Sequence, residues 1–132
     1  MNLLARREHS QYELHRKLKS QGYTDNLILD VLRELAQESL QSDARFTENY
    51  LRMRVNRGYG PLRIRAELRE RGITEDIISQ FLNENDKTWV TLAEQVLIKK
   101  FGKTLSKDFK ARAKQLRFLQ YRGFNFSYID QQ

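Results

Sequence analysis

Apolar residues recur along the chain at intervals of three and four, the spacing that places side chains on one face of an α-helix. Residues that favour helix N-caps precede these segments and glycines follow them, so the pattern predicts where helices begin and end. In the first half of the chain, the predicted helices are the tail of one at residues 3–7, one at 11–21 capped by Ser10, one after the cap Thr24, and one from about 43 after the cap Ser42. In the second half, helices are predicted at 61–71, after the cap Thr74, in a segment ended by Gly102, and from the cap Ser106 to about 121. A last, short helix is predicted after Asn125. The chain is therefore expected to be all-α.

The pattern of helix, glycine stop and capped helix occurs three times. Shifting the chain by 50 residues superimposes Gly22 on Gly72, and shifting it by 101 residues brings Gly123 onto the same place. Each of these glycines is followed two positions later by a capping residue. Self-similarity of this kind is typical of tandem modules, each too small to bury much apolar surface alone.

We therefore predict an elongated array of three tandem three-helix repeats, at residues 1–42 (with a truncated first helix), 43–86 and 87–132. The apolar stripes assign several large side chains to the interior. The residues expected to be core are Phe46, Leu68, Ile78, Phe118 and Leu119, and Leu27, Met53 and Phe109 are expected on the inward stripes of their helices.

Charge is concentrated in two places. The net charge is +7, and residues 87–132 carry all of it, with ten basic and three acidic side chains. Lys103, Lys107, Lys110 and Lys114 recur there at helical spacing, which predicts a continuous basic ridge. A second concentration lies between residues 52 and 71, which include seven arginines and only two glutamates. A polyanion or an acidic protein surface is the expected partner, although such cations are also common on solvated helix faces.

The sequence offers little for catalysis. There are no cysteines, and no apolar run approaches the roughly 18 residues of a membrane helix. The start lacks a secretory pattern, so a cytoplasmic protein is expected. His9 and His15 are expected to be surface residues, while Glu67 and Glu70 suggest salt bridges on an exposed face. No nucleophile has a base at a suitable spacing, so we expect no enzyme, no metal and no cofactor.

Several segments resemble the bacterial RecX regulatory family. The central match covers residues 42–46, Tyr50, residues 57–64 and residues 67–73, and further matches lie at 114–124 and at 4–10. The resemblance implies an all-helical chain of three tandem three-helix repeats that modulates the RecA recombinase, usually as an inhibitor. Such proteins bind the RecA filament on single-stranded DNA, contact successive subunits along its groove, and restrain filament growth, ATP hydrolysis and strand exchange.

Given that resemblance, the arginines of the central segment are candidate partner contacts, since a guanidinium binds carboxylate or phosphate through two parallel hydrogen bonds. They are Arg52, Arg57, Arg63, Arg65 and Arg69. Tyr59 is either an exposed contact or a packed turn residue. A second surface is expected at Lys107, Lys110, Lys114 and Arg117.

The protein is expected to be a monomer. Whether it contacts single-stranded DNA directly stays open, and so do two alternatives for its function. One is a stand-alone DNA-binding protein that uses a helix-turn-helix-like module. The other is a helical adaptor for an unrelated protein.

Overall fold

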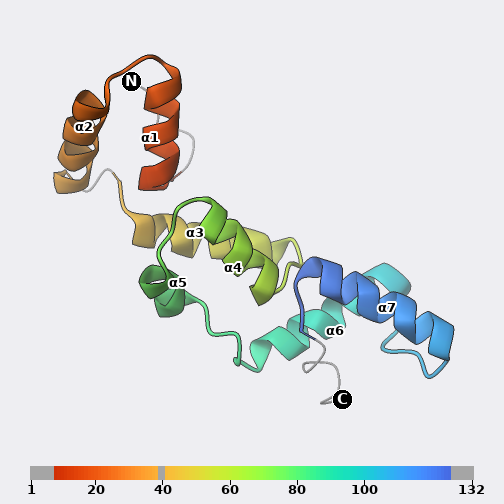
Figure 1. The fold of residues 1–132 in the computed structure, drawn as a ribbon. Coiled ribbons are helices and arrows are strands. Elements are labelled where there is room, and N and C mark those ends of the chain that lie inside the picture. The colour runs from red at the N-terminus through yellow and green to blue at the C-terminus, as the bar shows by residue number, and fades with distance from the viewer. Residues whose placement is uncertain (1–7, 39–40, 126–132) are drawn as a thin grey trace. The chain divides into compact units, whose positions relative to one another are not determined.

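The structure is a computed structural model that describes residues 8–38 and 41–125. Within these ranges it consists of helices without strands, which confirms the all-α prediction (Figure 1). The helices are α1 (Gln11–Ser20), α2 (Asp25–Gln37), α3 (Asp43–Asn56), α4 (Pro61–Glu70), α5 (Glu75–Phe81), α6 (Thr88–Phe101) and α7 (Phe109–Arg122). The helices predicted at residues 3–7 and after Asn125 lie outside the described residues.

Local capping chemistry starts α1, α2 and α3 where the sequence predicted. Ser10 forms a capping box with Glu13: the Glu13 N–H donates to Ser10 Oγ at 3.1 Å and the Ser10 N–H donates to Glu13 Oε1 at 3.2 Å. Thr24 accepts from a backbone N–H in the first turn of α2, and Ser42 does the same for α3. Each cap satisfies an N–H that has no partner inside the helix.

The start of α7 differs from the prediction. Its N-cap is Asp108, whose carboxylate accepts from the Ala111 N–H at 3.0 Å. Ser106 lies before the helix, and its backbone N–H donates to Gln115 Oε1 at 2.8 Å. Lys103 and Lys107 therefore precede α7, and the predicted ridge is not a single helical row.

Several predicted inward residues face solvent. Phe109, at the first position of α7, is 85% exposed, and Leu27 and Met53 are 47% and 41% exposed. Phe118 is half-buried, whereas the other predicted core residues are at most 2% exposed. The predicted stripes are thus wider than the faces that these short helices bury.

The described residues divide into two compact units. Unit 1 takes the residues up to 51 together with 67–81, and unit 2 takes residues 52–66 together with those from 82 onward. Both α3 and α4 therefore contribute residues to each unit.

In unit 1, α1 and α2 lie side by side, joined by a turn at Gly22 (Figure 1). Their facing sides form an apolar cluster of Leu14, Leu18, Ile28 and Leu32, with Val31 and Leu35 packed against it.

The remainder of unit 1 is organised around Tyr50. Its ring stacks on Phe46 with the ring centroids 5.7 Å apart, and its hydroxyl donates to Glu67 Oε1 at 3.1 Å. The Arg71 guanidinium lies 4.8 Å from the Tyr50 centroid. Glu67 is thus half-buried and part of the interior, and the expectation of a fully exposed glutamate pair is wrong. His9, expected at the surface, is also buried, at 9% exposure.

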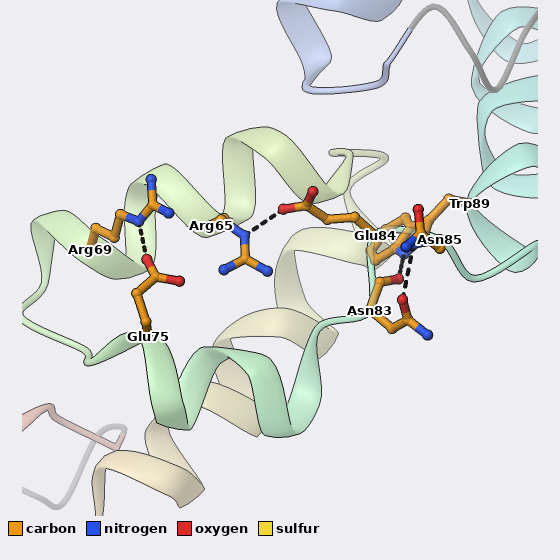
Figure 2. Close-up of polar contacts among 7 residues, drawn as sticks. All are labelled: Arg65, Arg69, Glu75, Asn83, Glu84, Asn85 and Trp89. Carbon is orange, nitrogen blue, oxygen red and sulfur yellow. Dashed lines mark hydrogen bonds and ion pairs between the residues drawn. The ribbon is translucent and has the colours of Figure 1, made fainter.

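In unit 2, α6 packs against α7 (Figure 1). The buried apolar residues of this unit are Ile64, Leu82, Trp89, Ala93, Val96, Leu97, Leu119 and Phe124. The Trp89 indole N–H donates to the Asn83 carbonyl oxygen at 2.8 Å, which fixes the entry into α6 (Figure 2). None of the helices in the described part of the chain has the length and apolar character to span a bilayer.

Candidate partner-binding surface

The turn between α3 and α4 is set by a glycine. Gly58 has φ +83°, a left-handed conformation that ends α3. Its N–H donates to the Val55 carbonyl at 2.9 Å, and the Tyr59 N–H donates to the Arg54 carbonyl at 3.1 Å. These two bonds form a Schellman motif, and α4 then begins at Pro61, whose missing N–H is not needed there.

The same turn is joined to the end of α7 by backbone contacts within unit 2. The Gly60 N–H donates to the Arg122 carbonyl at 2.7 Å, and the Leu62 N–H donates to the Gly123 carbonyl at 3.0 Å. A Cβ on Gly60 would lie 2.5 Å from the Gly123 oxygen, and one on Gly123 would lie 2.5 Å from Arg63 Cβ. Only glycine at both positions allows the two backbones to come this close.

Guanidinium groups surround the Tyr59 ring at this junction. The guanidinium carbons of Arg54, Arg63 and Arg122 lie 3.8, 4.5 and 4.8 Å from its centroid. Arg63 also lies 5.0 Å from the centroid of Tyr121 and donates to the Tyr121 carbonyl at 3.2 Å. Cation–π contacts of this kind contribute about 0.5–1 kcal/mol each at exposed sites.

This placement distinguishes between the two interpretations of Tyr59. The side chain is half-buried under three guanidinium groups, so the structure favours a packed turn residue. The exposed aromatic ring of the cluster is Tyr121, at 70%. Sequence reasoning missed both Tyr121 and Arg122, because the contact between the two glycine-containing backbones has no local signal.

The predicted arginine contacts differ in their surroundings. Arg65 donates to Glu84, and both side chains are largely covered, at 17% and 33% exposure (Figure 2). Arg69, on the part of α4 that belongs to unit 1, donates to the well-exposed carboxylate of Glu75 (Figure 2). Arg52 is exposed on α3, and so is Arg57, just beyond the end of that helix.

The predicted second surface is solvent-facing. Lys110, Lys114 and Arg117 are exposed on α7 at spacings of four and three, which places them on one face of the helix. Lys107 is exposed in the segment before it. None of these four forms an ion pair with another described residue, so their charges are available to a partner.

The fold and these surfaces define an all-helical chain of short helices that presents exposed cations without an ion-pair partner among the described residues. Three profiles match it in order: "RecX, first three-helix domain" at residues 1–35, "RecX, second three-helix domain" at 42–82 and "RecX, third three-helix domain" at 90–131. The chain therefore belongs to the RecX family.

Curated relatives agree over nearly the whole chain. "Regulatory protein RecX" of Pseudomonas entomophila (strain L48) is 47% identical over 129 residues, which are 98% of this chain and 83% of that protein. The protein of the same name from Legionella pneumophila is 43% identical over 125 residues, 95% of this chain and 83% of that protein.

Solved structures agree in fold. The crystal structure of RecX from Lactobacillus salivarius has a TM-score of 0.79 at 25% identity, covering 98% of this chain and 86% of that one. A crystal structure of regulatory protein RecX has a TM-score of 0.83 at 23% identity, covering 98% and 67%. Because its identity is only 23%, this second structure shows the shared fold alone.

Proposed function

We propose that this protein is a negative modulator of the RecA recombinase. It binds the RecA filament on single-stranded DNA and restrains filament growth, ATP hydrolysis and strand exchange, without catalysing a reaction itself. The observation that carries this proposal is the match of three successive three-helix segments to one regulatory family, with full-length relatives named regulatory proteins.

The exposed cations support the proposal by indicating the chemistry of the partner. Lys107, Lys110, Lys114 and Arg117 present positive charge that no carboxylate among the described residues neutralises. Such a surface attracts acidic protein surfaces and phosphate groups, and it accelerates encounter at low salt. We assign these four residues to the main contact surface.

The arginines take different parts in this proposal. Arg57, exposed beside the α3–α4 turn, is the arginine best placed for partner contact, and exposed Arg52 is a second candidate. Arg63 and Tyr59 hold the turn against the end of α7 and position the surface around it. The ion pairs of Arg65 and Arg69 favour a role in holding α4.

The test is the ATPase activity of RecA on single-stranded DNA, measured while this protein is titrated from well below equimolar ratio. Inhibition is expected. Strong inhibition at low ratio indicates capping of filament ends, and inhibition only near equimolar ratio indicates occupation of the filament groove. No inhibition at any ratio would contradict the proposal.

A charge reversal on α7 locates the contact. Lys110→Glu with Lys114→Glu is expected to weaken inhibition by about tenfold or more, because two attractive charges become repulsive. The fold is expected to survive, since Lys110 lies in the first turn of α7, where a glutamate favours the helix. The matched control is Lys17→Glu with Lys87→Glu. Both lysines are exposed; Lys17 lies on α1, and Lys87 directly precedes α6. Equal loss in both variants would show that net charge alone matters.

The same variants test the stand-alone DNA-binding alternative, which the basic face of α7 also favours. Tight binding to DNA that needs no recombinase, falls steeply with added salt and is lost in the α7 variant would support it.

A further inference from the structure

A basic groove lies between the end of α3, α6 and α7, all within unit 2. Its volume is about 380 Å³, a size that holds a side chain or two of a bound ligand. The lining residues are Val55, Asn56, Arg57, Gly58, Leu92, Gln95, Val96, Lys99, Lys100, Phe118 and Arg122. None of the predicted contact residues except Arg57 belongs to it.

The charge of the groove has one sign. Four of its lining residues are cations and none is acidic. Arg122 donates to the Arg57 carbonyl at 2.9 Å, and its guanidinium carbon lies 5.1 Å from the Phe118 centroid. The Lys100 ammonium lies 5.6 Å from the same ring. These partners are neutral, so they orient the cations without cancelling their charge.

The groove also has an apolar part. Val55, Leu92 and Phe118 are half-buried there, and Val96 is 9% exposed. A Cβ on Gly58 would lie 3.1 Å from Val96 Cγ2, so the glycine keeps this wall free of a further side chain. A ligand that only contacts cations would leave these side chains uncovered.

We infer that the groove docks a short acidic segment of a partner protein that carries an apolar side chain. The apolar side chain enters between Val55, Leu92 and Phe118, and flanking carboxylates meet Lys99, Lys100 and Arg57. Charge complementarity and the apolar recess together favour this occupant. A sugar–phosphate backbone would use the cations alone, and a base in the recess would meet a single aromatic ring, Phe118, among aliphatic side chains.

The test is direct binding measured by fluorescence anisotropy with a labelled synthetic peptide of about ten residues, in which one leucine is flanked by glutamates. The full chain is used, and no recombinase is present. The failure of this proposal is therefore distinguishable from failure of the proposed RecA function. The unlabelled comparison ligands are the same peptide with the leucine replaced by serine, and an oligothymidylate.

Lys99→Glu with Lys100→Glu is expected to weaken peptide binding by about tenfold or more, because two attractive charges become repulsive. Lys17→Glu with Lys87→Glu, which changes the net charge equally at exposed lysines outside the groove and outside α7, is expected to leave it within about twofold. Because glutamates in the last turn of α6 oppose the helix dipole, Lys99→Ala with Lys100→Ala provides a second variant that removes the charge and keeps helix propensity. It is expected to weaken binding by about threefold or more, because two attractive charges are lost.

Three outcomes would overturn the inference. Equal competition by the serine peptide would show that the apolar recess is unused. Equal loss in the Lys17 and Lys87 variant would show that binding follows net charge alone. Oligothymidylate binding that is lost in the Lys99 and Lys100 variants, with peptide binding unchanged, would assign the groove to nucleic acid.

Discussion

The backbones of the α3–α4 turn and the end of α7 approach closely at glycines. Replacing three glycines by alanine, one at a time, separates the cost of a left-handed φ from the cost of a steric clash. Gly102 and Gly123 both end helices with a left-handed φ, +75° and +99°. A Cβ on Gly102 would meet nothing within 4 Å, whereas one on Gly123 would lie 2.5 Å from Arg63 Cβ and 2.7 Å from its backbone nitrogen. Gly60 gives the reverse case, with the close contact and no left-handed φ.

The magnitudes follow from this geometry. Gly102→Ala carries only the left-handed penalty, about 1 kcal/mol of the free energy of unfolding. Ordinary contact begins near 3.4 Å, so in Gly60→Ala the backbone of Gly123 must retreat by about 0.9 Å. That movement weakens the two hydrogen bonds between the turn and α7 and strains the packing, at about 2–3 kcal/mol. Gly123→Ala combines both terms and is expected to lose about 3–4 kcal/mol.

The assay is urea unfolding followed by circular dichroism, with the slope of each transition compared with that of the parent. The expected order of loss is Gly123→Ala, then Gly60→Ala, then Gly102→Ala. If Gly60→Ala loses no more than Gly102→Ala, the turn and the end of α7 can separate without cost. The argument that glycine is needed for this contact would then be refuted.

Two further predictions concern polar contacts. Arg65→Met breaks the largely covered pair with Glu84 and is expected to lower the free energy of unfolding by about 1–2 kcal/mol. Arg69→Met breaks the exposed pair with Glu75 and is expected to lower it by less than about 1 kcal/mol. Urea unfolding of both variants checks this, and equal losses would count against the burial argument. The Thr88 N–H donates to the Asp86 carboxylate at the start of α6 and lowers the pKa of the Asp86 carboxyl below 3.8. The contact therefore stabilises the fold fully above pH 3.8, and this stabilisation is lost as the pH falls through the folded-state pKa. Unfolding measured between about pH 2 and pH 6 should show a shallower acid loss in Asp86→Asn, and an unchanged acid profile would show that the contact does not form.

Helix boundaries could be predicted from the sequence where they rest on local chemistry. Thr24 and Ser42 cap the helices that follow them, and Gly72 and Gly102 adopt the left-handed conformation that was expected after a helix. In each case the interacting atoms are within a few residues of one another, so no knowledge of the tertiary fold is needed.

The start of α7 could not be predicted, because two capping residues lie two positions apart. Ser106 and Asp108 are both suitable N-caps, and local preference does not separate them. The choice depends on Gln115, a buried side chain on the next turns of α7, which binds the Ser106 N–H and the Thr104 carbonyl. These bonds hold the preceding segment in a non-helical path.

The candidate surface was predictable in composition but not in arrangement. The sequence shows how many cations a segment has, whereas the structure shows what each one touches. The charge of Arg65 is balanced by the Glu84 carboxylate, while Arg122 meets a carbonyl and aromatic rings. Both are arginines in charge-rich stretches, and only the tertiary fold distinguishes them.

That difference supplies a physical criterion for the cations of this fold. A guanidinium paired with a partly covered carboxylate has its field cancelled nearby and contributes mainly to holding the fold, as Arg65 does in α4. A cation held by neutral partners is ordered and still charged, so a partner recovers the electrostatic attraction without also ordering a mobile side chain. By this criterion Arg122 and Lys100 are preorganised for an anionic partner, whereas the lysines on the exposed face of α7 attract it from a distance and must be ordered on binding. Charge reversal on α7 should therefore act mainly on the association rate, and reversal in the basic groove mainly on the dissociation rate.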